Sequence, residues 1–137
     1  MTRTRACINS YLRYTTGMVN FGSVMIGTAD PKKLAAFYQK VFGKKADWED
    51  GQWYGWQVGN THFTIGSHSE VKGKAKEPQR IILNLDTKDV KKEFERIKKA
   101  GAKVIKEPYS PDEAHDMLIA TFADPDGNYF QLTTPWE

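Results

Sequence analysis

The sequence lacks the features that mark several large classes of protein. Its single cysteine, Cys7, excludes a disulfide framework and suits a reducing compartment such as the cytoplasm. No apolar run approaches the roughly 20 residues that a membrane span requires. The chain also has no Gly-x-x-x-x-Gly-Lys phosphate loop and no nucleophile elbow, so we expect neither a P-loop nucleotide hydrolase nor an α/β-hydrolase.

Clustered positive charge is scarce as well. The net charge of +3 comes from Arg3, Arg5 and Arg13, which lie in a segment that holds no acid. Without these three arginines the basic and acidic residues are equal in number. A nucleic-acid surface usually needs a clustered basic face, so we expect no nucleic-acid partner.

Residues 1–17 stand apart from the remaining chain in composition. We interpret them as an N-terminal extension, with Met18 as the natural start and 18–137 as a single domain. Their arginine, serine and threonine content without acids also suits an organelle transit peptide, which is the alternative to a cytoplasmic protein.

Two short segments of similar pattern indicate an internal duplication. Near the C-terminus the turn Asp124-Pro125-Asp126-Gly127-Asn128 separates two apolar, aromatic runs, which predicts a β-hairpin. Earlier, Gly59-Asn60 separates two further such runs. Because these hairpins close two halves of similar length, we predict two tandem modules.

The first module, 19–67, has the order βαβββ. A strand is predicted at 21–28, where Val24 and Ile26 alternate with smaller or polar residues. Asp30 and Pro31 then begin a helix, whose apolar stripe ends before Gly43. Further strands are predicted at 45–48, 53–58 and 61–66. With Gly59-Asn60 as a two-residue turn, Trp56 and Phe63 face each other in the core.

The second module, 80–134, repeats this order after a polar linker at 68–79. A strand is predicted at 80–85 and a helix follows, with Thr87 as its cap and Gly101 at its end. A strand at 103–106, a loop at 108–116 and the C-terminal hairpin complete the module. The fold class is therefore α+β.

This combination of motifs resembles the vicinal oxygen chelate superfamily, which includes glyoxalase I, bleomycin- and fosfomycin-resistance proteins and extradiol dioxygenases. The resemblance covers 19–133 and rests on the tandem βαβββ modules, the Asp30-Pro31 helix start with Phe37-Tyr38, and the C-terminal turn. It implies curled, cup-shaped mixed sheets with the helices on their outer face, often closed across a homodimer.

Catalytic members of this superfamily bind a divalent metal through His, Gln or Glu on the first and last strand of each module. Carried over by motif, these four positions fall at Ser23, Thr64, Arg80 and Gln131. A hard cation prefers carboxylates or imidazoles, and a guanidinium would repel it. We therefore expect no metal and no other cofactor, unless the alignment of these positions is shifted by one or two residues.

The resemblance leaves a cup that is suited to a small organic ligand. We expect its lining to include Ser23, Trp53, His62, Thr64, Arg80, Tyr129 and Gln131. Trp53 is either a ligand platform or core, and Arg80 either anchors an anion or pairs with an acid. With Arg80 as anchor, the ligand would be anionic or aromatic.

Other histidines have simpler interpretations. His115 lies among acids in a loop without ligand periodicity, which favours a solvated loop over a metal site. His68 begins the linker and is expected to be exposed.

Three functional hypotheses follow. The first is a protein that binds a small molecule in its cup without metal, as drug-sequestering members of the superfamily do. The second is a metal-dependent enzyme, a glyoxalase-like lyase or a dioxygenase, whose ligands lie elsewhere. The third is a non-catalytic interaction scaffold. Metal content distinguishes the first two, and ligand-induced stabilisation distinguishes the first from the third.

Overall fold

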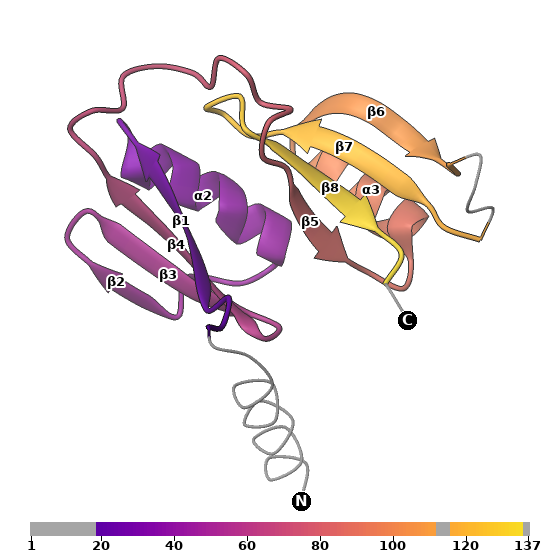
Figure 1. Ribbon diagram of the computed structural model, residues 1–137, viewed down its shortest axis with the longest axis horizontal. Helices are drawn as coiled ribbons and strands as arrows, with labels where there is room; N and C mark the ends of the chain where they lie inside the picture. Colours follow the sequence, from indigo (N-terminus) through magenta and orange to yellow (C-terminus); the bar gives the residue numbers. More distant parts are fainter. Residues whose placement is uncertain (1–18, 112–115, 136–137) are drawn as a thin grey trace, which may run out of the picture.

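The structure is a computed structural model, which describes residues 19–111 and 116–135. The predicted extension at 1–17 and His115 lie outside the described residues. Module one contains β1 (Ser23–Thr28), α2 (Pro31–Phe42), β2 (Trp48–Asp50), β3 (Trp53–Val58) and β4 (Thr61–Ser67). Module two contains β5 (Leu83–Asp86), α3 (Val90–Lys99), β6 (Lys103–Tyr109), β7 (Ile119–Ala123) and β8 (Tyr129–Thr133). Figure 1 shows the modules side by side.

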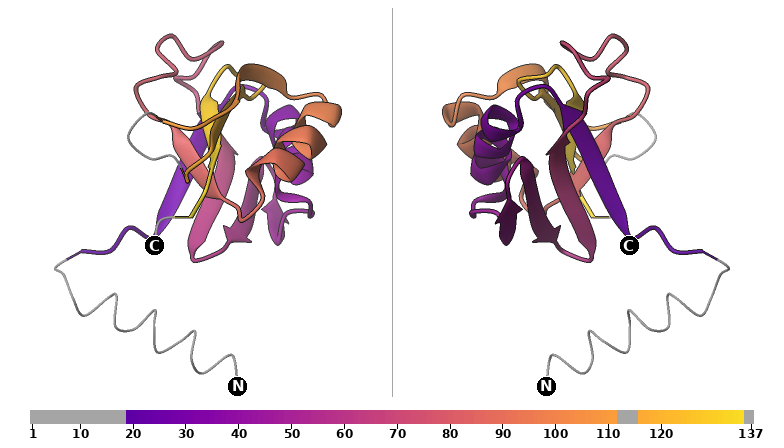
Figure 2. Two further views of the ribbon diagram at one scale, coloured as in Figure 1. Left: turned by 90° about the vertical axis from the view of Figure 1, so that its right-hand side faces the viewer. Right: turned by 90° about the vertical axis from the view of Figure 1, so that its left-hand side faces the viewer.

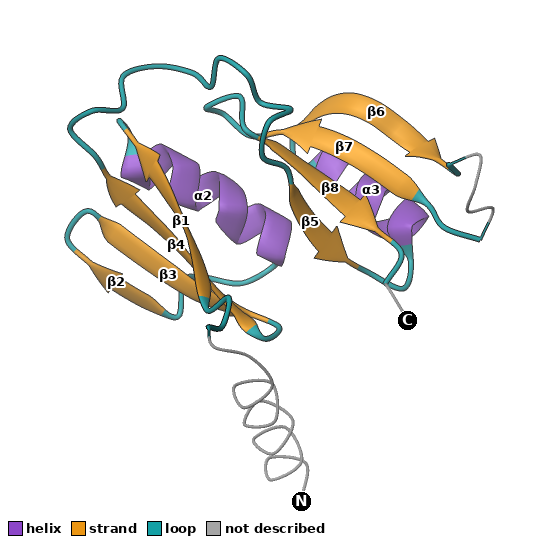
Figure 3. Ribbon diagram, viewed as in Figure 1, coloured by secondary structure: helices purple, strands orange, loops and turns teal. Residues whose placement is uncertain are grey.

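Each module forms a four-stranded mixed sheet of the same topology. The strand order is β1-β4-β3-β2 in one sheet and β5-β8-β7-β6 in the other, with the first pair parallel and the rest antiparallel. Each sheet has one helix packed on it, and both helices lie on the same side of the molecule (Figures 2 and 3). The predicted α+β fold of two tandem βαβββ modules is confirmed.

The two helices begin in the same way. Asp30 and Asp89 are the N-caps, with φ and ψ of −133° and 80° in one and −132° and 81° in the other. Each carboxylate accepts a hydrogen bond from the backbone N–H three residues later. Thr28 and Thr87 each accept the N–H of the capping aspartate through the side-chain oxygen. The prediction that Thr87 is itself the cap is therefore wrong.

The core is one aromatic cluster that joins both modules. Trp56 and Phe63 face each other across β3 and β4, as predicted, and both are buried. In module two, Phe122 stacks on Phe130. Tyr38 connects the halves, because its ring lies 4.9 Å from that of Phe63 and 5.9 Å from that of Phe130. Burying such rings in shared contacts fixes the helix of one module against the sheet of the other.

Polar contacts between the modules centre on the C-terminal turn. The Tyr38 hydroxyl donates to Asp124 at 2.7 Å, and the Thr28 hydroxyl donates to Asp126 at 2.6 Å. Burial, followed by the nearby Asp124 carboxylate, raises the pKa of Tyr38 well above its usual value. Burial also raises the pKa of Asp124, against the opposing effect of its hydrogen bonds. The predicted turn is thus also the contact that joins module two to α2.

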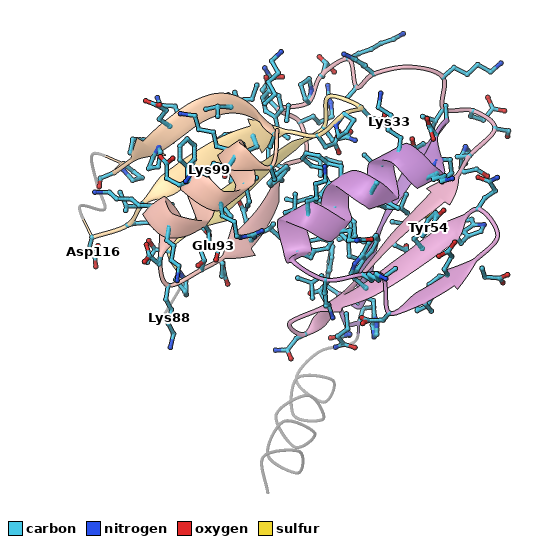
Figure 4. The ribbon with its side chains drawn as sticks, turned by 180° about the vertical axis from the view of Figure 1, so that it is seen from behind. Lys33, Tyr54, Lys88, Glu93, Lys99 and Asp116 are labelled. Atoms are coloured by element: carbon cyan, nitrogen blue, oxygen red, sulfur yellow. The ribbon has the colours of Figure 1, made fainter. Side chains whose placement is uncertain are left out.

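Module two also holds the C-terminal end of α2. Arg96 of α3 donates to the backbone carbonyls of Lys40 and Val41 at 2.7 and 2.6 Å. These carbonyls belong to the last turn of α2, where a cation is favoured by the helix dipole. Module two therefore contacts this helix at Tyr38 and at its last turn. The helix lies in front of the strands when the molecule is seen from behind (Figure 4).

Candidate functional site

The helix-free side of the module-one sheet gathers side chains from all four of its strands. Strand register defines them, because residues directly opposite each other point to the same face. Met25, Thr64, Gly55 and Trp48 form one row across the sheet, and Gly27, Gly66, Trp53 and Asp50 form the next. Ser23, His62 and Gln57 form a third row. These three rows are called the free face of module one below.

Two tryptophans lie flat on two glycines of this face. A Cβ at Gly66 would overlap Cε3, Cζ3 and Cδ2 of Trp53, and one at Gly55 would overlap Cε2, Nε1 and Cζ2 of Trp48. Overlap with three consecutive ring atoms means that the face of each indole, rather than its edge, covers the glycine. The opposite ring faces point away from the sheet, and Trp48 and Trp53 are 46% and 38% exposed. The two indoles together are called the aromatic surface below.

The start of the linker borders this surface at the β1 edge. A Cβ at Gly27 would lie 3.1 Å from the His68 Cβ and 3.5 Å from the Val71 Cγ2. His68 itself is exposed, as predicted, and its Nδ1 accepts the N–H of Glu70. Glycines at 27, 55 and 66 therefore leave room for the larger side chains above them, which the sequence pattern alone did not indicate.

One acid lies on the free face. Asp50 is opposite Trp53 in the register of β2 and β3, and it is exposed. The sequence pattern predicts this strand at 45–48, which leaves Asp50 outside it. The strand instead begins at Trp48. The Asp47 side chain just before it is held by neighbouring residues, because its carboxylate accepts hydrogen bonds from the Gln57 N–H at 2.6 Å and from the Lys44 ammonium. The Gln57 N–H, followed by Lys44, lowers the pKa of Asp47.

Four of the predicted ligand-binding residues come together here. Ser23 lies opposite His62, Thr64 lies in the next row, and Trp53 lies in the row beyond it. Tyr129 and Gln131 lie on β8 of module two, where the Gln131 amide donates to the Thr121 hydroxyl at 3.2 Å. The predicted lining is therefore divided between the sheets of the two modules.

Arg80 does not occupy the predicted position. β5 begins at Leu83, so Arg80 precedes the strand, in an exposed turn where it forms an ion pair with Glu77 at 2.7 Å. The error follows from the helix cap. The metal position of module one is seven residues before Asp30, and the same count from the true cap Asp89 gives Ile82 instead of Arg80.

The corrected positions fit a divalent metal no better. Ser23, Thr64, Ile82 and Gln131 offer no imidazole or carboxylate, and the Thr64 hydroxyl interacts with the Val24 carbonyl at 3.4 Å. Among residues 19–111 and 116–135, no three His, Cys, Asp or Glu side chains lie close enough together to hold a metal ion. The donor set at these positions is therefore unsuited to metal-assisted chemistry.

A separate cavity of about 1030 Å³ lies between the modules. Its walls come from the β3–β4 turn, the ends of α2, β5 and α3, with Phe21, Asn60, Leu83, Asp86 and Arg96 among the lining residues. Gln57 belongs to both this cavity and the free face. The sequence did not predict the cavity, because it forms where segments far apart in the chain meet.

The model of the glyoxalase-like domain family matches residues 23–133, which span nearly all of both modules. The chain belongs to this family. The resemblance to the vicinal oxygen chelate superfamily is therefore confirmed. No curated protein matches the chain in sequence.

Solved structures agree with this assignment. A glyoxalase/bleomycin resistance protein/dioxygenase family enzyme from Burkholderia phytofirmans PsJN is 26% identical, with a TM-score of 0.69 over 85% of this chain and 98% of its own. A glyoxalase-related enzyme from Fulvimarina pelagi is 18% identical, with a TM-score of 0.71 over 86% and 89% of the two chains. A glyoxalase I mutant from Zea mays is 20% identical, with a TM-score of 0.65 over 86% of this chain and 45% of its own.

The last two similarities concern the fold alone.

Within the described residues, no helix is long and apolar enough to cross a membrane.

Proposed function

We propose that this glyoxalase-like protein binds a small organic molecule on the free face of module one, without a catalytic metal. The observation that supports this most directly is the pair of tryptophans, each held flat on a glycine with its outer ring face exposed. Aromatic side chains with a few polar groups among them are the usual lining of small-molecule sites. Thr64 lies opposite Gly55, the glycine that Trp48 covers, and Ser23 and His62 supply further hydrogen-bonding groups in the next row of the same face.

A thermal-shift screen of small aromatic compounds tests this function. We expect hits that stabilise the parent protein and lose at least about fivefold in affinity when Trp53 is changed to leucine, because stacking contributes about 1–3 kcal/mol. Tyr109→Leu in module two is the control for loss of an aromatic ring. Trp56→Phe would not serve, because Trp56 is buried in the core. A screen without hits, or equal loss in both variants, would contradict the proposal.

The alternative function is that of a metal-dependent lyase or dioxygenase, as names of related structures suggest. The donor chemistry of Ser23, Thr64, Ile82 and Gln131 disfavours it. Elemental analysis of the purified protein distinguishes the two. We expect far less than one Zn, Ni, Fe or Mn per chain, and near-stoichiometric metal that survives mild chelation would favour the enzyme. A protein without metal or ligand would fit the scaffold hypothesis.

We also propose a homodimer. β1 and β5 are edge strands in this chain, and exposed edges tend to be covered by pairing or packing. Large apolar side chains at Phe21, Met25 and Ile81 are exposed near these edges. Light scattering should give about twice the 15.6 kDa of one chain. A monomer at tens of micromolar protein would contradict this assembly. The cytoplasmic location stays a prediction.

A further inference from the structure

The charge on the free face of module one points to the class of ligand, if the proposed binding function is correct. Among the residues of that face, Asp50 is the one acidic side chain, and no Lys or Arg belongs to any of the three rows. The arginine that had favoured an anionic ligand lies instead in an exposed ion pair with Glu77. The expected charge of the ligand therefore changes from negative to positive.

Asp50 also lies beside the aromatic surface. It is directly opposite Trp53, and it shares β2 and the same face with Trp48, two residues away. Side chains in such positions lie about 4.5–8 Å apart, within the span of a two- or three-ring molecule. The exposed face of an indole attracts cations in addition to stacking on flat rings. Both tryptophans and the carboxylate thus favour a flat ring with a positive charge.

We propose that the ligand is a small planar aromatic cation, which stacks on Trp53 and Trp48 and places its positive charge next to the Asp50 carboxylate. A neutral planar molecule keeps the stacking and loses the charge contact. A planar anion keeps the stacking and is repelled by Asp50. The three classes should therefore bind in the order cation, neutral molecule, anion.

Three acridine derivatives of similar size make this order measurable. N-methylacridinium is a permanent cation, acridone is neutral and acridine-9-carboxylate is an anion. Calorimetric titration at low salt should show about a fivefold loss of affinity at each step, as expected for unit charges about 4 Å apart in water. The preference should weaken as salt is added, because the site is exposed.

Variants on one strand assign the effect to Asp50. Asp50→Asn should bring the three affinities to within about twofold of each other while acridone binding stays unchanged. Glu49→Gln is the matched control, because Glu49 is the neighbouring exposed acid on the opposite face of β2. It should preserve the parent order. Trp53→Leu should weaken the binding of all three probes by at least about fivefold.

The outcomes separate this inference from the function on which it rests. If the probes bind in a Trp53-dependent way with no preference for the cation, the ligand class is wrong and the binding function stands. An equal effect of Glu49→Gln and Asp50→Asn would also overturn the ligand class. If no probe binds and Trp53→Leu instead changes the oligomeric state in light scattering, the aromatic surface is a contact between copies, and both proposals fail.

Discussion

The two modules share one backbone plan and differ in what they place on the helix-free side of their sheets. By strand register, Gly55 and Gly66 of module one correspond to Thr121 and Thr133 of module two, and Trp53 corresponds to Ile119. In module two, Thr133 donates to Asp86 at 3.1 Å and is 3% exposed. In module one, the same positions hold glycines covered by exposed indoles.

Under the proposed function, this difference assigns stability to module two and ligand binding to module one. Threonines in module two fill the space above the sheet and hydrogen-bond to their neighbours, which leaves little surface for a ligand. Glycines in module one have no side chain above the sheet, so a large ring can lie directly on the backbone. A cross-strand Trp–Gly pair stabilises the strand that the glycine alone would weaken. Module one can thus be the binding half.

The strongest test concerns the turn by which module two holds α2. Asp124→Ala removes the acceptor of Tyr38, of the Asp126 and Asn128 N–H groups and of the Asn128 amide. Leaving a buried hydroxyl unpaired and the turn unsupported should lower the free energy of unfolding by about 3–5 kcal/mol. Urea denaturation measures this. Asn60→Ala, in the module-one turn, is the control and should change stability by less than about 1 kcal/mol.

The next test concerns the glycine that Trp53 covers in module one. Gly66→Ala would force the Trp53 ring away from the sheet, which should lower the free energy of unfolding by about 1–3 kcal/mol and shift the tryptophan fluorescence. Gly22→Ala is the matched control, since its nearest neighbour would be 3.7 Å away. Equal stability of the two variants would show that the ring can move without loss, and that the glycine is not required.

The equivalent position in module two should behave differently. Thr133→Val keeps the volume of the side chain and removes its hydrogen bond to Asp86, so we expect a loss of about 1 kcal/mol in urea denaturation. Ligand binding should stay unchanged. If Thr133→Val weakened the binding of a thermal-shift hit as strongly as Gly66→Ala, the division of roles between the modules would be incorrect.

The smallest effect is expected at the N-terminus. Both modules are complete without residues 1–17, so a protein that starts at Met18 should have the melting temperature of the full chain. Differential scanning calorimetry of both proteins checks this. A fall of several degrees would mean that the segment packs on one of the modules and contributes to its stability.

The positions of the site residues could be predicted where one residue suits a cap or turn, and could not be predicted where two neighbouring residues suit the same role. Thr87 and Asp89 are both good N-caps, and the sequence alone favoured the wrong one. The structure uses Asp89 as the cap and Thr87 to support it. The shift of two residues moved the predicted cup position from Ile82 to Arg80, and with it the expected charge of the ligand.

The sequence by itself determined the elements and their repetition. Turn residues at 59–60 and 124–128, the helix start at Asp30-Pro31, and period-two strands are local signals, so they predict βαβββ twice and the buried pair Trp56 and Phe63. Only the tertiary structure decided what lies on the free face. Trp53 meets Gly66, and Asp50 joins them, because four strands pair in one register, and a shift of one residue would turn every side chain to the other face.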